Sequence, residues 1–226
     1  MSVFITGDVH GTLERFSNKN FKRHGIEPKP NDIFIVCGDF GIPWGLPRYT
    51  KEEQHWIKWF GEKPYQIAFC DGNHENFDLL NSLPSKIWNS GEVHIISHNI
   101  FHMKRGEVFN IEGNTYFVFG GAESIDKEFR EPGITWWKEE IPTIEEFQKG
   151  ALKLLNSYNN KIDYVITHAP PEYLPGYNDR HNDVTNMLKL FKDNISYKEW
   201  FFGHMHFERY YYEDRMRCMY KNFVKI

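Results

Sequence analysis

Residues 3–10 of the chain have the sequence VFITGDVH, a short apolar run that ends in a glycine turn carrying an aspartate and a histidine. Four more apolar runs, at 33–37, 66–70, 164–167 and 200–202, also end in polar turns. Runs of this length that are rich in Val, Ile and Phe, without polar alternation, are typical of strands buried on both faces. The sequence therefore predicts a set of buried strands, each followed by polar side chains.

The segments around these runs complete the prediction of an α/β fold. Helical patterns lie at 13–23, 51–60, 143–158 and 184–191, and the third of them opens with a capping box. Further strands are predicted at 94–97, 107–111, 115–119, 209–213 and 218–224. Residues 210–212 and 217–220, linked by 213–216, resemble a hairpin. Strands that alternate with helices, followed by a strand-rich end, indicate two mixed β-sheets packed as a sandwich and flanked by helices.

Composition indicates one globular unit. The chain has 226 residues, 40% of them hydrophobic, and no repeat or Pro/Gly-rich linker, so we expect a single domain over residues 1–226. A net charge of -4 argues against a basic surface for nucleic acid. Cys37, Cys70 and Cys218 lie far apart, as buried thiols in a reducing compartment do. Without a signal-peptide pattern or a run of about 20 apolar residues, we expect a cytoplasmic protein with no membrane span.

The polar residues that follow the buried strands are the types that bind metal ions. In α/β proteins ligands bind beyond the carboxyl ends of the strands, so the position of these residues is informative. An all-oxygen and nitrogen set disfavours structural zinc and suits Mn, or else Fe, Zn, Ni or Co, in an open catalytic site. Seven ligands are too many for one open ion, but they suit two divalent ions if Asp39 bridges them. The seven candidates are Asp8, His10, Asp39, Asn73, His168, His204 and His206.

A pair of ions in such a site favours one chemistry. Two divalent ions about 3.5–4 Å apart would clamp a phosphoryl oxygen and lower the pKa of a bridging water. The resulting hydroxide could attack phosphorus in line with the leaving group, while the ions stabilise the charge that develops on the equatorial oxygens. We therefore expect an enzyme that hydrolyses a phosphate monoester or diester without a covalent intermediate.

Five blocks, taken in order, resemble the calcineurin-like metallophosphoesterase superfamily. They are GDVH at 7–10, GDFG at 38–41, GNHE at 72–75, THAPP at 167–171 and GHMH at 203–206. The resemblance implies that Asp39 bridges two ions and that His74 stands near the leaving group as a general acid or hydrogen-bond donor. One ion would be held by Asp8, His10, Asp39 and His206, and the other by Asp39, Asn73, His168 and His204.

One difference from the superfamily's motifs bears on the substrate and leaves the predicted metal ligands unchanged. The Ser/Thr protein phosphatases of this superfamily have GDxxDRG at the second block, and the arginine of that motif is missing here. The loop that starts at Gly120 resembles small bacterial and phage members, and its Arg130 is a candidate phosphate ligand. The alternative for Arg130 is an ion pair with Glu128 or Glu131. Trp136 and Trp137 are either packing residues or a pocket wall, and Arg48 and Arg180 are weaker phosphate candidates.

Two alternatives to the phosphoesterase hypothesis remain open at this stage. One is a protein Ser/Thr phosphatase of the same superfamily, which the missing arginine disfavours. The other is a non-catalytic scaffold with the same fold, such as the related retromer subunit, although scaffolds of this kind lose the ligand set that is intact here. The partner would be a phosphoester, with nucleotides among the candidates, and the sequence gives neither the oligomeric state nor the metals.

Overall fold

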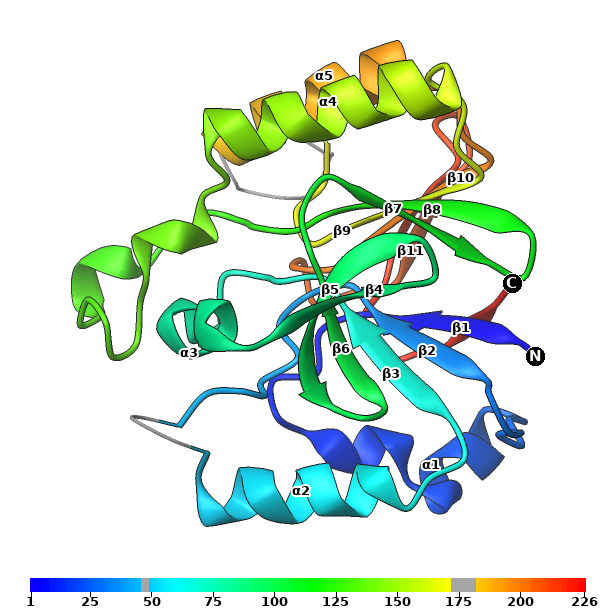
Figure 1. The fold of residues 1–226 in the computed structure, drawn as a ribbon, viewed down its shortest axis with the longest axis vertical. Coiled ribbons are helices and arrows are strands. Elements are labelled where there is room, and N and C mark those ends of the chain that lie inside the picture. The colour runs from blue at the N-terminus through cyan, green and yellow to red at the C-terminus, as the bar shows by residue number, and fades with distance from the viewer. Residues whose placement is uncertain (46–48, 172–181) are drawn as a thin grey trace.

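The computed structural model describes residues 1–45, 49–171 and 182–226. Its strands form two mixed sheets that pack face to face, with helices on both outer faces (Figure 1). This is the sandwich that the sequence predicted, so the α/β fold class is confirmed. Within the described residues, no helix combines the length and the apolar character that crossing a membrane requires.

The first sheet has seven strands in the order β13-β1-β2-β3-β6-β5-β4. Strands β1, β2, β3 and β6 run parallel in its middle, and antiparallel strands close both edges. The central strands are buried on both faces, as the unalternated apolar runs predict. The bounds are β1 (Val3–Thr6), β2 (Ile33–Val36), β3 (Gln66–Phe69), β4 (Ser85–Trp88), β5 (Gly91–Ser97), β6 (Ile100–Met103) and β13 (Val224–Lys225).

The second sheet has six strands in the order β11-β12-β10-β9-β8-β7. Here β12, β10, β9 and β8 are parallel, while β7 and β11 pair antiparallel at the edges. The predicted hairpin is confirmed, because β11 and β12 pair with Tyr210 opposite Arg217. The bounds are β7 (Glu107–Ile111), β8 (Asn114–Phe119), β9 (Tyr164–Thr167), β10 (Glu199–Phe202), β11 (Arg209–Tyr211) and β12 (Met216–Cys218).

Helices cover the two outer faces of the sandwich. Figure 1 shows α4 and α5 above the second sheet and α1 and α2 below the first. The core between the sheets takes residues from both, including Ile35 of β2 and Ile166 of β9. The bounds are α1 (Asn18–Arg23), α2 (Lys51–Gly61), α3 (Phe77–Ser82), α4 (Ile144–Tyr158) and α5 (Asp183–Asn194), with 3₁₀ turns at Leu13–Phe16, Lys127–Phe129 and Lys138–Glu140.

The sequence prediction differs from the structure at three places. The helix predicted over 13–23 is broken at Ser17, whose extended backbone ends the 3₁₀ turn and whose hydroxyl caps α1 by accepting from Asn20 N–H. Strands β4 and β6 and helix α3 were not predicted. The strand predicted over 218–224 is wrong, because β12 ends at Cys218 and the chain crosses to the first sheet to form β13.

Candidate metal centre

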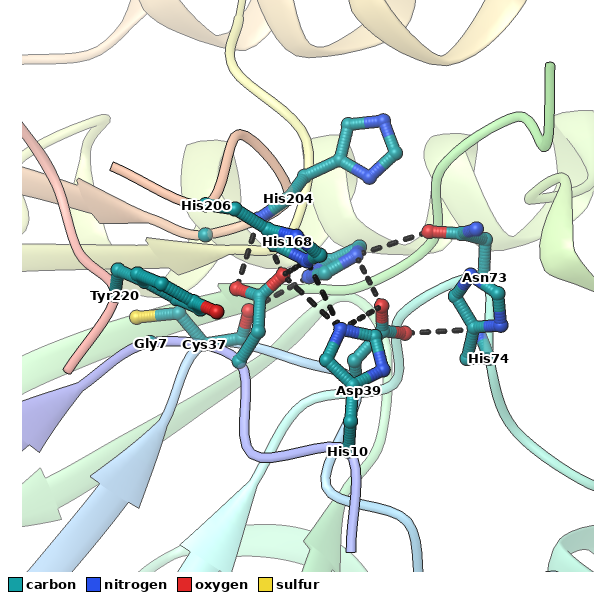
Figure 2. Close-up of polar contacts among 12 residues, drawn as sticks. Gly7, His10, Cys37, Asp39, Asn73, His74, His168, His204, His206 and Tyr220 are labelled. Atoms are coloured by element: carbon teal, nitrogen blue, oxygen red, sulfur yellow. Dashed lines mark hydrogen bonds and ion pairs between the residues drawn. The ribbon is translucent and has the colours of Figure 1, made fainter. Parts of the chain in front are cut away.

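The polar turns after β1, β2, β3, β9 and β10 meet at one end of the sandwich. These are the carboxyl ends of parallel strands from both sheets, so the ligand candidates of five separate sequence blocks come together there (Figure 2). Among the residues that the structure describes, two groups of three side chains have ligand atoms within 4.8 Å of one another, and both groups include Asp8. The first group is Asp8, His10 and His206, and the second is Asp8, Asp39 and His168.

The first group surrounds the buried carboxylate of Asp8. Its Oδ2 lies 3.0 Å from Nε2 of His206 and 3.8 Å from Nε2 of His10. The two ring nitrogens face each other at 2.9 Å. Asp8 is buried whereas His10 and His206 are exposed, so this group opens to solvent.

The second group is buried throughout. His168 Nε2 lies 3.3 Å from Oδ2 of Asp39 and 3.0 Å from Oδ1 of Asn73. On the other side of the ring, Nδ1 lies 2.7 Å from the carbonyl oxygen of Cys37 and donates to it, which directs Nε2 at the two oxygens. The amide nitrogen of Asn73 donates to Ser124 Oγ at 3.1 Å, so its oxygen also faces inward.

Asp39 belongs to the second group and also approaches the first. The same oxygen that contacts His168 lies 3.6 Å from Nε2 of His10. Its other oxygen accepts a hydrogen bond from the main-chain N–H of His74 at 2.8 Å. This carboxylate therefore contacts residues from both groups, which is the position that a bridging ligand requires.

His204 differs from the other six predicted ligands. Its main-chain N–H donates to Oδ1 of Asp8 at 2.9 Å, so its backbone belongs to the cluster. Its ring packs edge-on to the ring of His168 with 4.9 Å between centroids, and Figure 2 shows it pointing away from the two carboxylates. The structure thus brings six of the seven side chains together, and the role of His204 as a ligand stays a prediction.

Backbone geometry marks the same turns. His10, Asp39, His204 and His206 all have positive φ, between 48° and 67°, which residues other than glycine seldom adopt. Each such residue costs on the order of 1 kcal/mol or more and persists only where its surroundings fix it. A Cβ at Gly72 would overlap the Asp39 carboxylate, and one at Gly203 would overlap that of Asp8. These glycines leave the space that the acidic side chains occupy.

The electrostatics of the cluster call for positive charge. Burial alone would raise the pKa of Asp8, but His10, His168 and His206 outweigh it and hold that pKa well below its usual range. His168 has the same effect on the pKa of the buried Asp39. Burial opposes charge on His168, yet Asp39 and Asp8 raise the pKa of that imidazole to about 10. Two ionised carboxylates therefore lie side by side at neutral pH, balanced by cationic charge.

A family model described as calcineurin-like phosphoesterase matches residues 1–208. The chain belongs to the calcineurin-like phosphoesterase family. Among curated proteins there is no significant match.

Two of the solved structures that match this chain have low sequence identity to it. A phosphopantetheinyl hydrolase of Mycobacterium tuberculosis is 14% identical, with 97% of this chain and 88% of the other covered and a TM-score of 0.45. A serine/threonine protein phosphatase of Saccharomyces cerevisiae with similarity to human phosphatase PP5 is 12% identical, with 97% and 67% covered and a TM-score of 0.37. Because both similarities are this low, neither indicates the substrate of this family member.

His74 and Arg130 lie together beside the cluster. The two terminal nitrogens of Arg130 lie 2.9 Å from Nδ1 and 3.1 Å from Nε2 of His74. Arg130 is held from behind by Asp126, at 2.8 Å from Nε, rather than by the expected Glu128 or Glu131. Burial lowers the pKa of His74 to about 4; the carboxylate of Asp39 opposes this shift, and the positive charge of Arg130 adds to it. His74 is therefore neutral at neutral pH and Arg130 is positioned beside it.

Ser124, Glu140 and Arg105 support the site and were not predicted, whereas Asp71 was expected in either a supporting or a structural role. Ser124 accepts from Asn73 and donates to the buried Glu140 at 2.6 Å. Asp71 accepts from Arg105 Nε at 2.8 Å and contacts His102 at 3.1 Å, which anchors the turn before Asn73. Ser124 lies in the same Gly-rich loop as Arg130, but only Arg130 was predicted there to bind phosphate. A main-chain acceptor such as the Cys37 carbonyl leaves no signal in the sequence.

The other residues that the sequence singled out either lie apart from the cluster or fall outside the residues that the structure describes. Trp137 is buried, donates from Nε1 to Asp78 at 2.8 Å and packs edge-on against Trp44, so it is a packing residue. Glu75 is buried and accepts from the main-chain N–H of Phe40 at 3.1 Å, which supports the turn after Asp39. Arg48 and Arg180 lie outside the described residues.

Proposed function

We propose that this family member is a phosphoesterase that uses two divalent metal ions to hydrolyse a phosphate monoester or diester. The observation that carries the proposal is the position of Asp39, whose carboxylate contacts both His10 and His168. One ion would be held by Asp8, His10, Asp39 and His206. The other would be held by Asp39, Asn73, His168 and His204, for which the ring of His204 would have to turn from its direction in Figure 2.

The chemistry of the inward-facing ligand atoms fits cations at this position. With Nδ1 of His168 bonded to Cys37 and the amide nitrogen of Asn73 bonded to Ser124, the inward atoms Nε2 and Oδ1 are both acceptors facing a carboxylate. Acceptors gathered in this way need a proton or a metal ion among them. A set of oxygen and nitrogen ligands suits Mn²⁺ and other catalytic divalent ions. When bound, such ions supply Lewis acidity and a water of lowered pKa as the nucleophile.

The chain's own side chains would act on the phosphoryl group and the leaving oxygen. Arg130 lies beside His74 with its guanidinium partly buried, where it can bind a phosphoryl oxygen through two N–H groups. His74 is neutral, so it offers one ring N–H as a hydrogen-bond donor to the leaving oxygen. The main chain fixes it there, because its N–H is bonded to Asp39.

Hydrolysis of model esters tests this function. Protein loaded with manganese is assayed on p-nitrophenyl phosphate and on bis-p-nitrophenyl phosphate, which separates monoesterase from diesterase activity. His168→Ala is expected to lose bound metal by elemental analysis and to lose activity, because it removes a buried ligand. His98→Ala, at an exposed histidine, is the matched control. A protein that binds metal but hydrolyses neither ester nor any nucleotide would instead support a scaffold.

A further inference from the structure

A cavity of about 430 Å³ opens beside the metal centre and has no role in the function described so far. His10 and His74 form its end nearest the metal centre. From there the cavity runs between the turn after β2 and the start of α2, with Trp44 and Trp56 in its lining. Its volume lies within the range of about 300–1,000 Å³ that is usual for small-molecule sites.

The walls of this cavity, which we call the indole pocket, include aromatic and aliphatic side chains. Besides the two tryptophans they include the buried side chains of Leu13 and Ile42. Gly11 contributes only main chain, and a Cβ placed there would meet no atom within 4 Å, so the space above it is open. Indole rings beside bare main chain favour a planar aromatic ligand, which stacks on the ring faces.

The indole pocket also has two acidic side chains in its lining, Glu52 and Glu53. The carboxylate of Glu53 is already engaged, because the main-chain N–H groups of Trp44, Gly45 and Thr50 donate to it. Glu52, the next residue on α2, is exposed and lines the same cavity. A carboxylate in the lining accepts hydrogen bonds from hydroxyl or amino groups and repels a second phosphate. The pocket therefore suits an uncharged aromatic group that carries such donors.

We propose that the indole pocket binds the leaving group of the phosphoester, an alcohol that carries an aromatic ring system, with a nucleoside as its best-fitting form. This assignment rests on the proposed function. In the reaction, water oxygen bonds to phosphorus, the bond from phosphorus to the alcohol oxygen breaks, and that oxygen takes up a proton. His74 borders both the metal centre and the pocket, so its ring N–H can reach the oxygen where the bond breaks. Trp44 and Trp56 then determine substrate specificity.

The test compares an aromatic with an aliphatic leaving group in the same protein. The measured quantity is kcat/KM for adenosine 5′-monophosphate divided by that for glycerol 2-phosphate, with phenyl phosphate as a third substrate. Trp56→Ala and Trp44→Ala should each lower this ratio by about 5- to 150-fold, the loss expected for one stacking contact. Trp56→Phe keeps a flat ring and should restore most of the ratio. Lys58→Ala, on the exposed side of α2, is the control and should leave the ratio unchanged.

Equilibrium dialysis of adenosine against metal-free protein gives a second readout that does not depend on catalysis. Wild-type protein should bind adenosine, and Trp56→Ala should bind it more weakly by a similar factor. Binding that depends on Trp56 without hydrolysis of any ester would overturn the phosphoesterase proposal and keep the pocket. Hydrolysis with a ratio unchanged in both alanine variants, and no adenosine binding, would overturn the pocket and keep the phosphoesterase. If the alanine variants lost kcat/KM only for phenyl phosphate, the leaving group would be an aryl alcohol and not a nucleoside.

Discussion

His74 has a neutral ring held between a cation and the metal centre. Its pKa of about 4 is caused first by burial, and Arg130 lowers it further. A neutral imidazole has one N–H and one acceptor nitrogen, so only one of the two nitrogens that Arg130 approaches can accept from it. Both roles that the sequence left open for His74, hydrogen-bond donor and general acid, stay predictions.

Replacement of His74 by asparagine tests these roles. His74→Asn keeps a side-chain N–H donor of different reach and leaves every predicted metal ligand in place. We expect bound metal to stay at the wild-type level while kcat falls by about 10²–10⁴, the range for loss of a positioned proton donor. Elemental analysis and steady-state kinetics measure the two effects. A matched loss of metal would show that His74 is structural or itself a ligand.

The positions of the ligand candidates in the sequence were the most predictable feature of the site. Each ligand candidate follows a buried strand, and six of the seven side chains gather within one cluster. The supporting contacts were not predictable, because they depend on pairings across the fold. Ser124 reaches Asn73 over 51 positions, and the Cys37 carbonyl reaches His168 over 131. Such contacts use common residue types or the main chain, so no local pattern marks them.

At the scale of elements, buried strands and capped helices were predicted best. Helix α4 begins after Thr143 with the predicted capping box, and α2 spans nearly the predicted range. Strand β6 was missed although all its residues are buried, because His102 interrupts the apolar run. That histidine is compatible with burial only because it contacts Asp71 and His94. Tertiary contacts therefore decided β6, whereas local capping signals were enough for α4.

Helix α4 is tied to the second sheet by a buried carboxylate. Glu107, at the start of β7, pairs with Lys149 at 2.9 Å and also with Lys153. Burial would raise its pKa, but the two lysines outweigh that effect and lower it below the ordinary value. A carboxyl group whose pKa is lowered by folding stabilises the fold above its unfolded pKa. That stability is lost as the pH falls through the folded pKa.

Glu107→Gln should therefore destabilise the protein at neutral pH and matter little in acid. We expect the free energy of unfolding at pH 7 to fall by about 1–2 kcal/mol, between the values for an exposed ion pair and a buried charged hydrogen bond. The difference from wild type should shrink as the pH drops below about 4, where the wild-type carboxyl also becomes protonated. Urea denaturation across this pH range measures it, with Glu145→Gln on the exposed face of α4 as control. If the difference in the free energy of unfolding between wild type and Glu107→Gln did not depend on pH, the ion pairs of Glu107 would not be its cause.

On the scale of the whole molecule, the metal centre is where the two sheets meet. Asp8, Asp39 and Asn73 follow strands of the first sheet, while His168 and His206 follow strands of the second. Ions held by both sets would cross-link the sheets at the open end of the sandwich. Binding to the native state alone stabilises a protein by mass action, by about 2.7 kcal/mol when the free ligand is at 100 times its Kd. Metal occupancy should therefore contribute to the stability of the entire fold.

Thermal unfolding with and without manganese measures this contribution. For a chain of this size 1 kcal/mol shifts Tm by about 2–4 °C, so saturating manganese should raise Tm by about 5–10 °C and a chelator should reverse the shift. Asp39→Asn should abolish most of it, because the proposed bridge serves both ions, whereas Asp193→Asn on the exposed face of α5 should keep it. If Asp39→Asn kept the full shift, the ions would have to bind without a bridge between the two groups. If His168→Ala kept the full shift as well, the stabilisation would come from the Asp8, His10 and His206 group alone.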